Sequence, residues 1–187
     1  MKKALVTLAA LILWPAVGTT DVSSAAITSE ISRLGANKVV AKLYESPKDW
    51  RDLMAAVATG KPQWLQVAVK LHSGVDGGTA EELLEAIGEG LEHRPKDVLA
   101  LAVPTFRLED ICGGPDIDDS RFDSIQSAFA AIGRRQRKVA SIAEPDLRKR
   151  ADECIRMLEE SKHQIERFFG KPSAMAPNKS LERTREG

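Results

Sequence analysis

The sequence has few of the residues that build metal or redox sites. Its 187 residues contain two cysteines and three histidines, and the histidines lie far apart, at His72, His93 and His163. A structural zinc site takes four closely spaced cysteine or histidine ligands, and this chain has no such spacing. We therefore expect neither a metal nor another cofactor.

An excess of charge of either sign is also missing. Lysine and arginine together number 27, as do aspartate and glutamate, so the formal net charge is zero. Nucleic-acid-binding proteins hold the phosphate backbone with a surplus of positive charge. We therefore expect no nucleic-acid partner.

Only the N-terminus contains a long apolar run. Two lysines precede an apolar stretch over residues 4–17, and small residues follow it. This order predicts an export signal within residues 1–25, cleaved after Gly18 or after Ala25. The stretch is shorter than the roughly 20 residues that a membrane-spanning helix needs. We expect no permanent membrane span after cleavage; the alternative is an uncleaved anchor.

Cleavage would place the mature protein outside the cytoplasm. The location would be the periplasm in a Gram-negative bacterium and the medium in other hosts. Residues 26–170 are expected to form a single domain, long enough to bury a core. Residues 171–187 contain almost no apolar side chains and predict a disordered tail.

Helical periodicity runs through the body of the chain. Apolar residues recur at spacings of three and four between helix start signals such as Ser46-Pro47 and stop signals such as Gly60. No pair of alternating segments predicts strands. We expect an all-α fold of about six to seven helices, either a compact bundle or a short array of antiparallel helical hairpins.

Start and stop signals place the individual helices. Predicted helices start near Ile27 (interrupted near Gly35), at Pro47, at Pro62, at Thr79 after a capping box, at Pro95, after Ser120 and at Pro145. Residues 104–119 are expected to form an ordered loop, because they contain two prolines, two adjacent glycines and several acids.

The two cysteines are predicted to pair. Cys112 lies in the expected loop, and Cys154 lies on the apolar face of the last predicted helix. Pairing is the usual state of two cysteines in an oxidising compartment. We predict a disulfide that ties the loop to the core; the alternative is two separate thiols.

Although the net charge of the chain is zero, two segments carry strong local charges of opposite sign. Residues 109–123 have a local charge of −5, and residues 134–150 have a local charge of +5. The blocks either neutralise each other or bind a partner. The candidate residues of the acidic loop are Asp110, Asp116, Asp118 and Asp119. The candidate partner-binding residues are Arg134, Arg135, Arg137, Lys138, Arg148, Lys149 and Arg150.

The leading hypothesis is a non-catalytic, protein-binding domain of the periplasm, immunity-like or adaptor-like, with another periplasmic protein as its partner. In size, export and helix content the chain resembles the small, cysteine-bridged helical immunity proteins that neutralise type VI secretion effectors. This resemblance includes no motif and implies no site residues. One alternative is an envelope hydrolase that uses a carboxylate of the acidic loop. Another is a carrier of a small apolar molecule beside Trp50 and Trp64.

Overall fold

The computed structural model of the chain describes residues 23–114 and 124–169. Within these ranges every regular element is a helix, which confirms the predicted all-α fold. The predicted tail, nearly all of the predicted export signal and the aspartates Asp116, Asp118 and Asp119 lie outside the described residues.

The helices follow one another with short connections. They are α1 (Ser24–Leu34), α2 (Ala36–Tyr44), α3 (Pro47–Ala58), α4 (Pro62–Leu71), α5 (Gly77–Gly90), α6 (Pro95–Asp97), α7 (Leu108–Cys112), α8 (Ile125–Ala140) and α9 (Pro145–Phe169). A single 3-10 turn, η1 (His72–Gly74), follows α4, and a π-helical turn, η2 (Val98–Ala102), follows α6.

Most helix starts agree with the sequence signals. Proline occupies the first position of α3, α4, α6 and α9. A backbone N–H group at that position has no partner within the helix, so proline, which lacks the group, costs no hydrogen bond there. Ser46 caps α3 by accepting a hydrogen bond from the Asp49 N–H group at 3.4 Å. Gly35 separates α1 from α2 with a φ of 85°, in the left-handed region that favours glycine.

Two predicted starts are wrong in position. Helix α5 begins at Gly77 behind Asp76, whose N–H group donates to Thr79 Oγ1 at 2.9 Å, so Thr79 closes the capping box instead of opening it. Helix α8 begins behind Ser124, with Ser127 in the same closing role, four residues later than the predicted cap at Ser120. A hydroxyl at the third helical position can accept this bond in place of a carboxylate, so the sequence signal of these two caps has no acid at that position.

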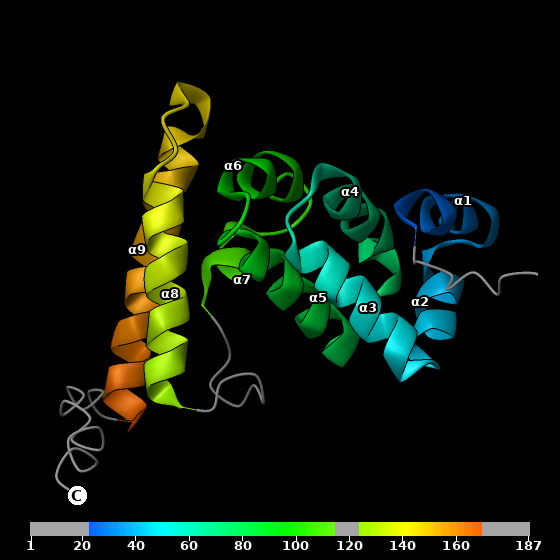
Figure 1. Ribbon diagram of the computed structural model, residues 1–187, viewed down its shortest axis with the longest axis horizontal. Helices are drawn as coiled ribbons and strands as arrows, with labels where there is room; N and C mark the ends of the chain where they lie inside the picture. The colour runs from blue at the N-terminus through cyan, green and yellow to red at the C-terminus, as the bar shows by residue number, and fades with distance from the viewer. Residues whose placement is uncertain (1–22, 115–123, 170–187) are drawn as a thin grey trace, which may run out of the picture.

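The helices form a two-row array, which Figure 1 shows in one view. Helices α1 and α4 and the turn η2 pack side by side in one row, and α2, α3, α5 and α7 do so in the other. Helix α9 contacts the last member of each row, η2 and α7, and α8 packs along α9 as an antiparallel hairpin. Of the two predicted architectures, the array is the one present.

A continuous apolar core runs between the two rows. Leu53, Leu65, Leu83 and Leu99 have no exposed surface and come from four different elements of the array, α3, α4, α5 and η2. The chain lies close to itself where α3 and α5 end, at Gly60 just after α3 and at Gly90, the last residue of α5. A Cβ atom added at Gly60 would be only 3.0 Å from the carbonyl oxygen of Gly90. Every helix of the array therefore depends on its immediate neighbours for burial.

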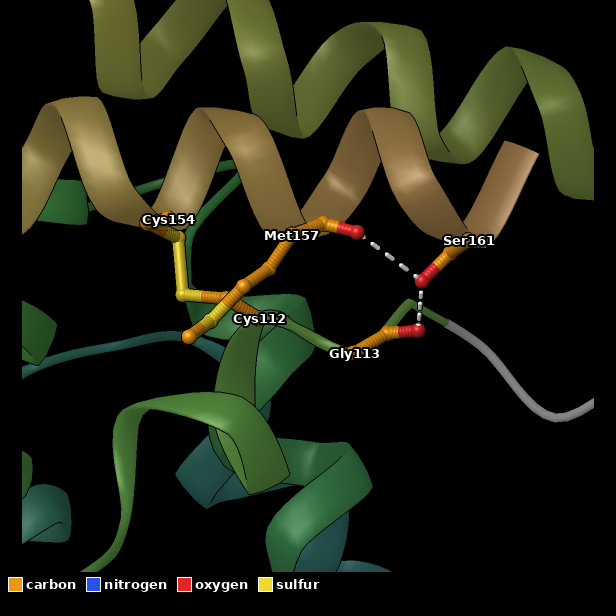
Figure 2. The surroundings of a disulfide bond; sticks show 5 residues. All are labelled: Cys112, Gly113, Cys154, Met157 and Ser161. Atoms are coloured by element: carbon orange, nitrogen blue, oxygen red, sulfur yellow. Dashed lines mark hydrogen bonds between the residues drawn. A yellow bond between two sulfur atoms is a disulfide. The ribbon is translucent and has the colours of Figure 1, made fainter. Parts of the chain in front are cut away.

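The predicted disulfide joins the array to the hairpin (Figure 2). The sulfur atoms of Cys112 in α7 and Cys154 in α9 lie 2.00 Å apart, and both residues are fully buried. Two turns further along α9, Ser161 Oγ lies within hydrogen-bonding reach of the carbonyl oxygens of Gly113 and Met157. The bridge and this hydroxyl together fasten the end of α7 to α9.

Helix α7 lies within the segment that was predicted to be a loop. Glu109 and Asp110 stand in its first turn, where negative charge is favourable, and Ile111 and Cys112 are buried. Five residues are too few to form a stable helix alone. Its order comes from packing and from the disulfide, which the local sequence pattern does not reveal.

We predict that replacing both cysteines (Cys112→Ala with Cys154→Ala) lowers the free energy of unfolding by about 4 kcal/mol. The bridge links residues 42 positions apart, and opening it returns chain entropy to the unfolded state. Urea titration under oxidising conditions measures the loss. Ser161→Ala is the matched control, with an expected loss of about 1 kcal/mol. A double variant as stable as the wild type would contradict the prediction.

Candidate functional site

The seven predicted partner-binding residues do not form one surface. Arg135 differs most from its prediction, because its side chain is only 1% exposed. It lies on the buried face of α8, in line with Ala131, Ile132 and Val139. Arg135 is therefore part of the core and cannot contribute to an exposed basic surface.

The guanidinium of Arg135 lies between α5, α7 and α8. Gly88 makes room for it: a Cβ atom at that position would lie 3.4 Å from Arg135 Nη1 and 2.9 Å from the carbonyl oxygen of Ile111. Arg135 Nε lies 3.6 Å from Glu92 Oε1. Among the described residues, neither Nε nor Nη2 has a hydrogen-bond partner.

Burial lowers the pKa of Arg135, and the negative charges of Glu92 and Glu89 oppose this shift. An arginine nevertheless stays charged in proteins, so the structure holds a buried cation near Glu92 in the turn after α5 and near Glu89 of α5. The prediction that Arg135 helps to bind a partner is therefore wrong, because its side chain is buried in the core. The small residues Ala128 and Ala131 mark the same buried face.

Two more of the predicted residues make contacts within the fold. Arg134 Nε donates to Glu92 Oε2 at 2.5 Å, which adds a second ion pair between α8 and the turn that follows α5. Arg150 Nη1 donates to the carbonyl oxygen of Leu99 at 3.1 Å and so ties α9 to η2. Both side chains have structural partners before any other protein binds.

The remaining four, Arg137, Lys138, Arg148 and Lys149, are exposed but form two separate pairs. Gln136 Nε2 donates to Glu159 Oε2 at 2.7 Å, which sets these two residues at one level of the hairpin. At 1.5 Å per residue, Arg148 then lies about 15 Å further along the hairpin axis than Arg137. In Figure 1 the start of α9 accordingly extends beyond the end of α8.

The exposed face of α9 carries charges of both signs. Its exposed acids and bases are equal in number: Asp146, Asp152, Glu153 and Glu160 against Arg148, Lys149, Arg156 and Arg167. Within the described ranges, no ion pair joins the acidic block to the basic block: Glu109 pairs with Arg107, and Arg134 pairs with Glu92. Four of the six acids of the acidic block lie outside the described residues, so mutual neutralisation of the two blocks stays a prediction.

An ion pair holds the connection between α8 and α9 to the array. Lys96 of α6 bonds to Glu144, just before α9 begins. This bond lowers the pKa of Glu144 and raises the pKa of Lys96. Ile142 in the same connection is buried. The base of α9 is therefore anchored, although Arg148 and Lys149 point into solvent.

A pocket of about 200 Å³ opens between the start of α5 and the segment that joins η2 to α7. Its lining combines apolar side chains with polar groups from both elements. The lining residues are His72, Val75, Ala80, Leu84, Thr105, Phe106, Arg107 and Asp110. Asp110, which is the described member of the predicted acidic-loop residues, lies in this concave site.

The polar groups of the pocket have different partners. The ring of His72 meets Phe106 edge to face, with centroids 4.7 Å apart and an interplanar angle of 71°. Arg107 is engaged by Glu109 through both Nε and Nη2. Asp110 is exposed and has no ion-pair partner in the described part of the chain. Among the charged side chains that line the pocket, Arg107 is paired with Glu109, whereas the carboxylate of Asp110 has no described ion-pair partner.

His72 and Asp110 were not connected by the sequence, which separates them by 38 positions. The fold brings both to one pocket, together with the hydroxyl of Thr105. No hydrogen bond links these three side chains in residues 23–114 or 124–169. The pocket thus lacks the bonded nucleophile, base and orienting group of a hydrolytic triad.

The tryptophans considered for a carrier role belong to the core. Trp50 is buried, its ring meets Tyr44 edge to face, and its Nε1 donates to Glu82 Oε2 at 2.5 Å. Trp64 is partly buried against the same core. Neither residue lines the 200 Å³ pocket.

The described residues bring no three His, Cys, Asp or Glu side chains together in an arrangement suited to a metal ion. In the described ranges, no helix combines the length and apolar character needed to cross a membrane. Comparison with protein-family models, with curated proteins and with solved structures gives no significant match.

We predict that Arg135→Ala lowers the free energy of unfolding by about 3 kcal/mol. The variant removes a buried side chain and the buried positive charge that Glu92 and Glu89 face. Arg134→Ala is the control: it removes a half-exposed ion pair to the same Glu92 and should cost less than about 1 kcal/mol. Urea denaturation compares the two. Equal losses would contradict a core role for Arg135.

A second pair of substitutions separates fold contacts from free charge in α9. Arg150→Ala should cost about 1.5 kcal/mol, because it removes a charged donor from the Leu99 carbonyl oxygen. Arg148→Ala should leave stability unchanged or raise it by a few tenths of a kcal/mol, since positive charge opposes the macrodipole in the first turn. Thermal unfolding measures both variants. A larger loss for Arg148→Ala would reverse these roles.

Proposed function

We propose that this chain is an exported, non-catalytic protein-binding domain with an adaptor-like or immunity-like role in the bacterial periplasm. The two-row helical array is the observation that carries this proposal. Helices that contact only their neighbours leave long row surfaces uncovered, and arrays of this kind bind other proteins through those surfaces.

Two features support export, and the start of α1 bears on the cleavage site. The N-terminal sequence has the order of a signal peptide, and the disulfide suits an oxidising compartment. Helix α1 begins at Ser24, so cleavage after Gly18 would leave α1 whole, whereas cleavage after Ala25 would remove its first two residues. We propose Gly18 as the last residue of the signal.

The pocket supports binding over catalysis or transport. Its volume of about 200 Å³ lies below the 300–1,000 Å³ typical of small-molecule sites. Asp110, the described candidate acid that lines the pocket, has no hydrogen-bonded base among the described residues. A hydrolase and a small-molecule carrier are therefore the less supported candidates.

Arg148 and Lys149 are the best-placed charges for steering a partner. They are exposed, they have no ion-pair partner among the described residues, and their position at the start of α9 opposes the helix macrodipole. The fold gains nothing from these two charges. We propose that they attract an acidic surface of the partner.

The proposal predicts a stoichiometric protein complex. The mature protein is captured from the native host's envelope after cross-linking, and intact complexes are weighed by mass spectrometry. The purified partner is then titrated by calorimetry. Arg148→Glu with Lys149→Glu should weaken binding about tenfold, with the loss concentrated in the association rate.

Arg137→Glu with Lys138→Glu, about 15 Å away, is the matched control and should change the affinity less than twofold. Thermal unfolding of both double variants must match the wild type for the comparison to be valid. Recovery of the protein alone, under conditions that retain known periplasmic complexes, would overturn the proposed function.

A further inference from the structure

We infer that the pocket between α5 and α7 receives one apolar side chain of the protein partner, followed by a lysine or arginine of that partner. This inference rests on the proposed function and specifies the chemistry of the partner at one point. It is carried by the pocket's size, its apolar lining and the free carboxylate of Asp110.

The size of the pocket sets the size of its occupant. An apolar cavity of about 150 Å³ holds a benzene ring, so about 200 Å³ suits one phenylalanine or leucine side chain and excludes larger groups. Val75, Ala80, Leu84 and Phe106 supply apolar contact surface. Single side chains buried in such pockets are typical anchors of protein interfaces.

The charge of Asp110 beside the pocket determines which charge the partner residue next to the anchor should carry. Arg107 is neutralised by Glu109, so the carboxylate of Asp110 is the remaining formal charge of the lining. A cation one residue from the anchor would pair with it at the exposed rim. An acidic residue in the same place would meet uncompensated negative charge.

Two further polar groups can meet the partner's backbone. His72 is exposed at the pocket and Thr105 is partly buried, and neither side chain makes a hydrogen bond within the described residues. Each can donate to a carbonyl oxygen or accept from an N–H group. A polypeptide therefore satisfies this rim better than a hydrocarbon does.

The test uses three blocked dipeptides and the mature, isotope-labelled protein. N-acetyl-phenylalanyl-lysine amide should bind in the millimolar range and shift the amide resonances of His72, Thr105 and Asp110. The phenylalanyl-glutamate probe should bind about fivefold more weakly because of its charge, and the alanyl-lysine probe should bind more weakly still because it has no anchor.

Two variants locate the binding. Asp110→Asn should abolish the preference for lysine over glutamate, whereas Asp152→Asn, on the exposed face of α9, should keep it. Ala80→Leu adds three carbon atoms to the pocket and should weaken all phenylalanyl probes at least fivefold. Equal binding of the three probes, resonance shifts elsewhere, or a preference that survives Asp110→Asn would overturn the inference.

The same variants separate this inference from the proposed function. If a captured partner binds Asp110→Asn and Ala80→Leu as tightly as the wild type, the proposed function stands and the pocket inference fails. If the phenylalanyl-lysine probe binds as expected but no protein partner is found, the chemistry of the pocket stands and the proposed function fails.

Discussion

The attachment of the α8–α9 hairpin to the helical array governs the rest of this structure. Two fully buried groups contribute to it: the Cys112–Cys154 bridge to α7, and the guanidinium of Arg135, which lies against Gly88 of α5 and 3.6 Å from Glu92 in the turn after α5. The bridge stabilises the fold by restricting the unfolded chain, whereas the buried cation costs desolvation energy that nearby acids offset. The position of this cation also fixes which face of α8 is buried.

The basic side chains of α8 and α9 fall into two groups, those that bind other residues of the fold and those that remain in solvent. Arg134, Arg135 and Arg150 bind partners inside the fold, whereas Arg148 and Lys149 remain in solvent. Five bases that look equivalent in the sequence thus have two different physical roles. The helical period alone could not separate them, because their partners lie in the turn after α5 and in η2, far away in the sequence.

Sequence periodicity predicted the helices well and the side-chain partners poorly. Proline starts and glycine breaks are local signals, so the bounds of α3, α4 and α9 followed from them. The disulfide was predictable because a chain with two cysteines offers one intramolecular pairing, and the expected export favoured the oxidised state. The burial of Arg135 and the meeting of His72 with Asp110 depend on tertiary packing, and no local pattern encodes either.

Helix α7 links the disulfide to the candidate binding pocket. It carries Asp110 at the pocket and Cys112 in the bridge, two positions apart. A helix of five residues has little stability of its own, so its position is held by the bridge and by the burial of Ile111. One wall of the pocket therefore depends on an oxidised cysteine pair. In this architecture the compartment that forms the disulfide also completes the surface that the partner would meet.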